Sequence, residues 1–162
     1  MPKSTEFMEL VQTNQGIIRK LVGLYADNEE QRKDLYQEIL LQAWKGYPAF
    51  RGDAKFSTWL YRISLNTILT SQRKPNRIDY RESVEEALLT DESDPVKNEN
   101  KRMLRQEVRR LPEIERAIVS LHFDGYSNPE IAEMMGISIN NATVKLHRIK
   151  NQLIIQLQPQ IS

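Results

Sequence analysis

The sequence contains no cysteine among its 162 residues, which excludes a disulfide framework, a thiolate metal site and a cysteine nucleophile. Aromatic residues make up only 7% of the chain, and few segments alternate apolar and polar residues, so a β-sheet is not favoured. No segment approaches the roughly 20 apolar residues that a membrane helix needs. We therefore expect an all-α, cytoplasmic protein with no membrane insertion, no metal and no cofactor.

Charge is strongly segregated along the chain, although the formal net charge is only +1. Residues 45–77 hold seven Lys or Arg and one acidic residue, which gives this segment a net charge of +6. Residues 78–100 hold two basic and eight acidic residues, which gives a net charge of −6. A basic block followed by an acidic one is typical of a module that binds a polyanion, joined to a linker that does not.

Apolar periodicity in the first half of the chain predicts three helices, over residues 4–25, 28–48 and 57–74. Asn28 has a side chain suited to cap the second of them, and Pro48 ends it. The segment between Pro48 and Phe56 is expected to be a loop with a turn at Gly52. The residues expected to face the core are Tyr36, Ile39, Leu40, Ala43 and Tyr47 of the second helix, and Leu60, Ile63 and Thr67 of the third.

The second half of the chain is expected to form a separate helical domain. Pro95 and Pro112 each stand at the start of a helical pattern, and the second pattern places Ile114, Ile118 and Leu121 inside. Residues 76–94 show little sustained apolar pattern. The sequence therefore predicts an N-terminal domain over residues 1–75, a linker over 76–94 and a C-terminal domain over 95–162.

The stretch YSNPEIAEMMGISINNATVKLHRIKNQL, residues 126–153, has the spacing of a helix-turn-helix. Ser127 and Glu130 form an S-x-x-E capping box, which begins a helix. Gly136 suits the left-handed conformation that ends this helix, and Ser138 can cap the next one. In such a motif the second helix normally enters the DNA major groove.

The second helix of this motif has a composition that favours DNA as its partner. One buried stripe is expected at Ala142, Leu146, Ile149 and Leu153. Residues 138–158 include three Lys or Arg and no acidic residue. Asn pairs well with adenine, and Lys or Arg with guanine or phosphate. The alternative is a solvated polar face on an ordinary helical hairpin. The candidate DNA-binding residues are Ser138, Asn140, Asn141, Thr143, Lys145 and Arg148.

A second candidate site combines aromatic and basic residues in the segment FRGDAKFSTWLYRISLNTILTSQRK, residues 50–74. This mixture suits single-stranded nucleic acid, because cations follow the backbone while aromatic rings stack on exposed bases. The alternative is that Phe56, Trp59 and Tyr61 are simply core residues. The candidate contacts are Lys55, Phe56, Ser57, Trp59, Arg62, Asn66 and Arg73.

Asp34, Gln37 and Glu38 form a polar, partly acidic face on the second expected helix. Such a face is poorly suited to DNA, and on chemistry alone we interpret it as solvated surface.

The order of these motifs resembles the extracytoplasmic-function (ECF) group of bacterial RNA polymerase sigma factors. The residues that carry the resemblance are D-L-x-Q-E at 34–38, F-R-G-x-A-x-F-S-T-W-L-Y-R-I at 50–63 and L-P at 111–112, followed by the helix-turn-helix. The resemblance implies a bacterial protein whose N-terminal domain, region two, binds the polymerase clamp and the single-stranded −10 promoter element. Its C-terminal domain, region four, would bind the duplex −35 element.

The resemblance gives each candidate residue a role. Asp34, Gln37 and Glu38 match the clamp-binding motif of core RNA polymerase. The aromatic and basic residues of 55–73 would capture an extruded base of the −10 element, and the helix-turn-helix residues would read the −35 element. An anti-sigma factor is a usual partner in the family. The recognition helix begins Ile139-Asn140-Asn141-Ala142, where many members have an acidic residue followed by Gly-Thr-Val, so its DNA preference is open.

Two other functions fit the residues less well, and we expect no enzymatic activity. A helix-turn-helix regulator could bind duplex operators without being a polymerase subunit. An enzyme acting on nucleic acid would need convergent acids or a histidine site. His122 and His147 have no paired carboxylates nearby in the sequence, and His147 is better interpreted as a phosphate contact or a surface residue.

Overall fold

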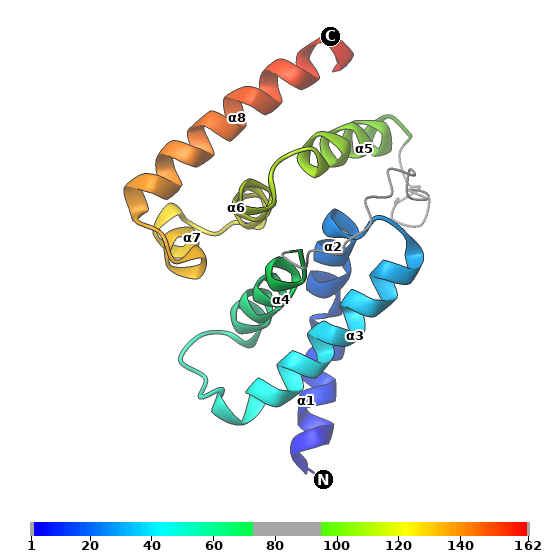
Figure 1. Cartoon of the computed structure of the whole chain (residues 1–162), viewed down its shortest axis with the longest axis vertical. Helices are drawn as coiled ribbons and strands as arrows, with labels where there is room; N and C mark the ends of the chain where they lie inside the picture. The colour runs from blue at the N-terminus through cyan, green and yellow to red at the C-terminus, as the bar shows by residue number, and fades with distance from the viewer. Residues whose placement is uncertain (1, 73–94, 162) are drawn as a thin grey trace. The chain divides into compact units, whose positions relative to one another are not determined.

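The computed structural model describes residues 2–72 and 95–161, and within these ranges the regular elements are helices without a strand. The chain divides into two compact units, residues 1–85 and residues 86–162 (Figure 1). The all-α, two-domain architecture expected from the sequence is confirmed. The predicted linker over residues 76–94 lies outside the described residues, so the domain boundaries stay a prediction.

The N-terminal unit is built from α1 (Pro2–Thr13), α2 (Gln15–Tyr25), α3 (Glu29–Gly46), the short 3-10 helix η1 (Tyr47–Ala49) and α4 (Phe56–Gln72). Helices α2, α3 and α4 pack against one another in pairs, with α3 and α4 side by side (Figure 1). Their shared core consists of fully buried apolar residues from all three helices, namely Ile18, Leu21, Tyr25, Ile39, Ala43, Leu60, Tyr61 and Ile68.

The single helix predicted over residues 4–25 is wrong, because the structure breaks it at Asn14. The Asn14 side-chain Nδ2 donates to the Leu10 carbonyl oxygen at 2.8 Å, and the Asn14 backbone N–H donates to the same oxygen at 3.1 Å. Asparagine competes in this way with regular helical hydrogen bonds, and a glycine follows two residues later.

Helix α3 begins where the sequence predicts. The Asn28 side chain accepts a hydrogen bond from the Gln31 backbone N–H at 2.8 Å, and two acidic residues occupy the first turn. The buried stripe is shifted from the expected one, because Leu35 is buried and Tyr36, Leu40 and Tyr47 are half-buried. In α4, likewise, Ile63 and Thr67 are half-buried, and the core contacts come from Leu60, Tyr61, Ser64, Leu65 and Ile68.

The C-terminal unit is built from α5 (Pro95–Arg109), α6 (Glu113–Phe123), α7 (Asn128–Met135) and α8 (Ile139–Ile161). Helix α6 packs against each of the other three, so it is buried on more than one side. Five consecutive residues, 117–121, are buried there. Ile114, which was expected inside, is 38% exposed because it lies in the first turn, ahead of this buried run.

The predicted helix-turn-helix is present as α7 and α8. Ser127 Oγ accepts from the Glu130 backbone N–H at 3.3 Å, and Glu130 Oε1 accepts from the Ser127 backbone N–H at 2.8 Å, which completes the capping box. Gly136 has φ 71° and ends α7. Ser138 Oγ then accepts from the Asn141 N–H at 3.0 Å and caps α8. The expected stripe on α8 is confirmed, since Ala142, Leu146, Ile149 and Leu153 are all buried.

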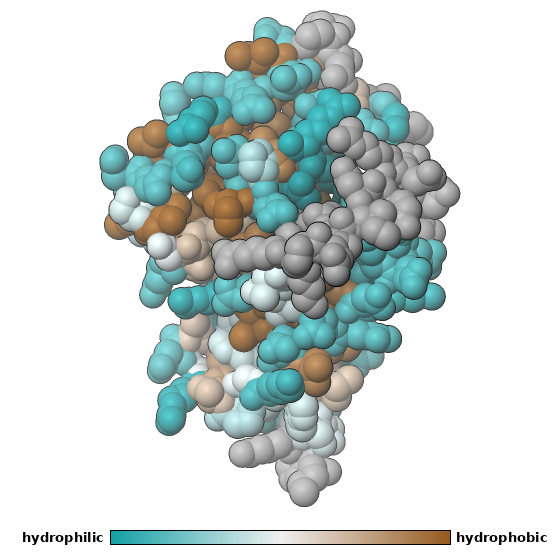
Figure 2. Space-filling view, in the orientation of Figure 1, coloured by the Kyte–Doolittle hydropathy of each residue, from teal (hydrophilic) through white to brown (hydrophobic). Residues whose placement is uncertain are grey.

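The surface seen in Figure 2 is mostly hydrophilic, with hydrophobic residues in several separate patches. The exposed large apolar residues among those described are Met8, Leu41, Trp44, Ile114, Phe123, Ile139, Val144, Ile154 and Ile155. Over the described residues, the helices are all too short or too polar to cross a membrane.

Candidate nucleic-acid and polymerase interfaces

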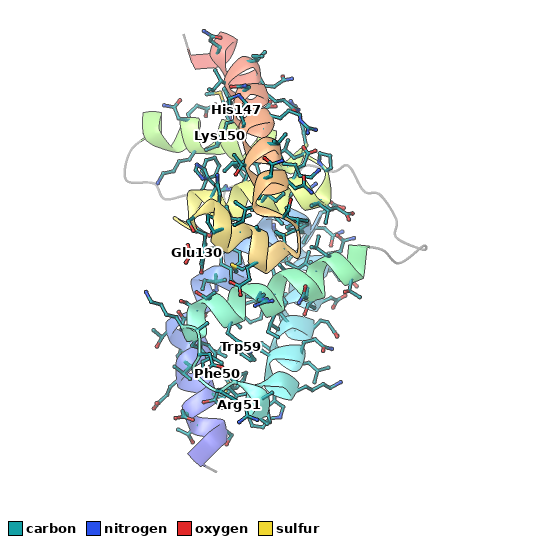
Figure 3. All side chains as sticks on the ribbon, turned by 90° about the vertical axis from the view of Figure 1, so that its left-hand side faces the viewer. Phe50, Arg51, Trp59, Glu130, His147 and Lys150 are labelled. Atoms are coloured by element: carbon teal, nitrogen blue, oxygen red, sulfur yellow. The ribbon has the colours of Figure 1, made fainter. Side chains whose placement is uncertain are left out.

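The face of α8 opposite its buried stripe is open to solvent. Of the sequence-predicted residues, Ser138, Asn140, Asn141, Thr143 and Arg148 are exposed and Lys145 is half-buried. His147 and Lys150 are exposed on the same helix (Figure 3). The structure thus brings all six predicted residues to the N-cap and the first three turns of α8, on a face with no acidic residue.

Two of these six side chains also stabilise the motif itself. Ser138 Oγ is occupied as the cap of α8. Thr143 Oγ1 accepts a hydrogen bond from Asn128 Nδ2 at 3.2 Å, which ties the start of α7 to the second turn of α8. This bond and the small, buried Ala132 fix how closely the two helices approach. Asn140, Asn141 and Arg148 therefore carry more of the free polar surface than Ser138 and Thr143 do.

The loop between α3 and α4 is held by a cluster of six aromatic residues, defined here as Phe7, Trp44, Tyr47, Phe50, Phe56 and Trp59. The ring centroids of Phe50 and Trp59 are 5.2 Å apart, those of Phe56 and Trp59 are 5.4 Å apart, and Phe7 lies 5.1 Å from Tyr47. Edge-to-face and tilted contacts at these distances are favourable. The aromatic cluster joins α1, α3, η1, the loop and α4 at one end of the unit.

Members of the aromatic cluster differ in exposure. Phe56 is only 9% exposed and serves mainly as a core residue, whereas Phe50 and Trp59 are half-buried and keep surface for a ligand. Phe50, Arg51 and Trp59 lie near one another where the loop meets α4 (Figure 3). Of the polar residues that flank them in the sequence, Ser57 is half-buried, and those that are exposed are Lys45, Arg51, Asp53, Lys55, Arg62 and Asn66. Arg73 lies outside the described residues.

Tyr61 belongs to the core, as the alternative interpretation held, because it is 1% exposed. Lys20 of α2 reaches it: the Lys20 Nζ lies 5.1 Å from the Tyr61 ring centroid and donates to the Tyr61 hydroxyl at 3.4 Å. Burial of the amine lowers the pKa of Lys20 to about 8. The Lys20 side chain as a whole remains exposed, so the loss of solvation is confined to its tip.

The predicted polar face on α3 is exposed as well. Asp34, Gln37 and Glu38 all point to solvent, and Glu38 Oε2 accepts from Gln42 Nε2 at 2.9 Å. The same side of α3 continues with Leu41 and Trp44, each 45% exposed. A polar, partly acidic patch that borders on exposed apolar side chains is suited to a protein surface rather than to DNA.

Comparison with known protein families finds a matching family model for each of the two units. The family model described as Sigma-70 region 2 matches residues 10–78, and the one described as Sigma-70, region 4 matches residues 101–153. Together these two matches cover most of the chain. The chain belongs to the ECF sigma factors of bacterial RNA polymerase.

The curated relatives agree with this sigma factor assignment. The ECF RNA polymerase sigma-E factor of Escherichia coli K12 is 30% identical over an alignment of 172 positions, which covers 96% of this chain and 88% of the relative. RNA polymerase sigma factor YlaC of Bacillus subtilis is 31% identical over 134 residues, 76% of each chain. The protein therefore directs core RNA polymerase to promoters during transcription initiation. A helix-turn-helix regulator without this role is not favoured.

A solved structure shares the fold. The sigma factor RpoE of Bartonella quintana, crystallised in complex with the anti-sigma factor NepR, matches 94% of this chain and 97% of its own with a TM-score of 0.77. At 16% sequence identity this likeness shows the fold alone. It supports the same order of helices in both units.

Sequence reasoning missed the extent of the aromatic cluster. Tyr47 was predicted only as a core residue of the second helix, while the structure packs Tyr47 and Phe7 against Phe56 and packs Trp44 against Phe7. The run of aromatic residues at 44, 47, 50, 56 and 59 was the available signal. Lys20 gave no signal, because its partner Tyr61 is 41 residues away. Among the described residues no group of three or more His, Asp or Glu side chains could hold a metal ion.

Proposed function

We propose that the loop and the exposed side of α4 bind the single-stranded −10 element. The strongest support is that Phe50 and Trp59 are in contact and only half-buried, and that exposed basic and amide side chains flank them in the sequence. A base extruded from the duplex could stack on this surface, and stacking of this kind contributes about 1–3 kcal/mol per base. Lys55, Arg62, Asn66 and Arg73 would hold the backbone, Ser57 would add a hydroxyl, and buried Phe56 would support the Trp59 ring.

The first turns of α8 bind the duplex −35 element under the same proposal. Asn140, Asn141 and Arg148 would read base edges, while Lys145 and the hydroxyls of Ser138 and Thr143 would contact phosphates. The support is the acid-free, exposed face held in position by the capping box, Gly136 and the Asn128–Thr143 bond.

The exposed face at Asp34, Gln37 and Glu38 is the proposed contact with the clamp of core RNA polymerase. The division into regions at 1–75, 76–94 and 95–162 is part of the proposal, as are a cytoplasmic location and the absence of any enzymatic activity of its own. An anti-sigma factor is proposed as a further partner, because a structural neighbour was crystallised with one.

The test compares two single-residue variants in holoenzyme assembled from the full chain and core RNA polymerase. Lys145→Ala should weaken binding to duplex promoter DNA and reduce the slope of log Kd against log salt by about 0.9, the value for one lost phosphate contact. Arg62→Ala should weaken binding to a promoter that is already unpaired at the −10 element. Each variant should leave the other binding reaction nearly unchanged.

Matched controls come from the same units. Lys101→Ala removes an exposed lysine of α5, and Arg19→Ala removes an exposed arginine of α2, and neither helix carries a residue of the proposed DNA faces. Both controls should behave as wild type. Equal losses for Lys145→Ala and Lys101→Ala, or for Arg62→Ala and Arg19→Ala, would show that general charge rather than these faces determines binding.

A further inference from the structure

Val144 is an apolar residue in the middle of the polar outer face of α8, and its exposed fraction is 49%. It stands two residues from Ala142 and two from Leu146, both of which are buried. At 3.6 residues per turn, two residues correspond to about 200° around the helix, so Val144 lies almost directly opposite the core. It occupies the outermost line of the proposed −35 face.

Stability does not account for valine at this position. Valine is among the weaker helix formers, because its branched side chain loses rotamer freedom in a helix. A half-exposed valine gains only part of the burial that would offset this loss. A single exposed apolar residue elsewhere would need no explanation, but this one lies one turn after Asn140 and one turn before Arg148, within the proposed DNA-reading residues.

The neighbours of Val144 suit base edges of different kinds. Asn140 can pair with adenine and Arg148 with guanine. His147 Nε2 lies 3.2 Å from Asn151 Nδ2, a contact that holds the imidazole ring along the same face. The one group in the major groove that an aliphatic side chain recognises is the C5-methyl of thymine. Residues four apart on a helix rise about 6 Å, which corresponds to roughly two base pairs.

We infer that Val144 is a specificity-determining residue that reads a thymine methyl group in the −35 element, within about two base pairs of the base paired with Asn140. This inference rests on the proposed assignment of α8 to the −35 element. The proposed contact can be tested by removing one methyl group, because deoxyuridine differs from thymidine only in lacking that group and forms the same base pair.

The experiment first selects duplexes from a pool randomised across the upstream element, using holoenzyme assembled from the full chain and core RNA polymerase. Each thymine of the best selected duplex is then replaced in turn by deoxyuridine, and Kd is measured for wild type, Val144→Ala and Val144→Ile. Ile155→Ala serves as the matched control, because Ile155 is an exposed branched apolar residue of the same helix, 67% exposed and eleven residues further on.

One thymine position should weaken wild-type binding about fourfold when its methyl group is removed, the value for one buried methylene-sized group. Val144→Ala should bind the thymine and deoxyuridine duplexes equally, while Val144→Ile and Ile155→Ala should keep the difference. If a selected duplex shows no thymine whose methyl effect disappears in Val144→Ala, the inference is overturned and the −35 assignment stands. If no duplex is enriched at all, both are overturned.

Discussion

At the scale of single residues, Lys20 gives the N-terminal unit a pH dependence. Burial lowers the pKa of its amine to about 8, below the ordinary value of 10.5. The unfolded chain therefore binds more protons than the folded one between these two values, so the free energy of unfolding should rise as pH increases through this window. The effect should be modest, because Lys20 is partly exposed and solvent screens its charge.

Trp44 and Trp59 are the two tryptophans of the chain, and both lie in the N-terminal unit, so their fluorescence follows its urea unfolding. Wild type should show an unfolding midpoint that is higher at pH 9.5 than at about pH 7.5. Lys20→Met should be more stable than wild type at the lower pH and should lose this rise. Lys33→Met, at an exposed position of α3, should keep the wild-type rise. A rise that persists in Lys20→Met would mean that another group causes it.

Substitutions of Phe56 and Trp59 in the aromatic cluster should affect the stability of the unit and its binding of DNA differently. Phe56→Ala removes a nearly buried ring from the aromatic cluster and should lower the free energy of unfolding by about 3–5 kcal/mol. Trp59→Ala removes a half-buried ring and should cost less stability, but should lose about 1–3 kcal/mol of binding to a template unpaired at the −10 element. Trp44 fluorescence and equilibrium binding measure the two quantities. Unchanged binding by Trp59→Ala would assign the ring to the core alone.

At the scale of the elements, the turn between α7 and α8 depends on one backbone conformation. Gly136 has φ 71°, and a Cβ added there would meet no atom within 4 Å. Substitution should therefore be limited by backbone strain and not by steric overlap. Gly136→Ala should lower the free energy of unfolding of the C-terminal unit by about 1–2 kcal/mol, the cost of the left-handed region for an L-residue.

Gly136→Asn is the matched comparison, because asparagine adopts the left-handed region more readily than alanine does. It should therefore lose less stability in urea unfolding followed by circular dichroism. Equal losses for the two substitutions would mean that the side chain itself, and not the value of φ, disturbs the turn.

The sequence predicted an element well where the signals for it lie close together along the chain. The capping box at Ser127, the glycine at 136 and the stripe from Ala142 to Leu153 each depend on residues within about three helical turns, and the structure confirms them. The break at Asn14 was missed because a side chain there competes with the helix while the apolar pattern runs on across it. Ile114 was misplaced because helical spacing alone does not show how many neighbours surround α6.

The sequence predicted which residues belong to the candidate site better than it predicted how their side chains pack. Exposure of Asp34, Gln37, Asn140 and Arg148 follows from helical spacing, which the sequence reveals. Which face of Trp59 is covered depends on Phe50, Phe56 and Tyr47, which approach it only after the loop has folded. These ring contacts depend on the conformation of the loop, which the spacing of the aromatic residues does not specify.

At the scale of the whole molecule, a sigma factor must act on one promoter in two physical states. Each unit has its own buried core, and each carries its proposed DNA face on residues that its own helices hold in place. A substitution on one face should therefore leave the other unit folded and able to bind. The two DNA-binding reactions should be separable by mutation within the complete chain.

Footprinting of a promoter selected by the holoenzyme tests this central claim most directly, with upstream protection and permanganate reactivity of unpaired thymines measured on the same complexes. Trp59→Ala should keep the upstream protection and lose the reactivity at the −10 element. Arg148→Ala should lose the upstream protection on duplex DNA and still bind a template already unpaired at the −10 element. If either variant instead lost both signals together while remaining folded, the two faces would not act on separate promoter elements.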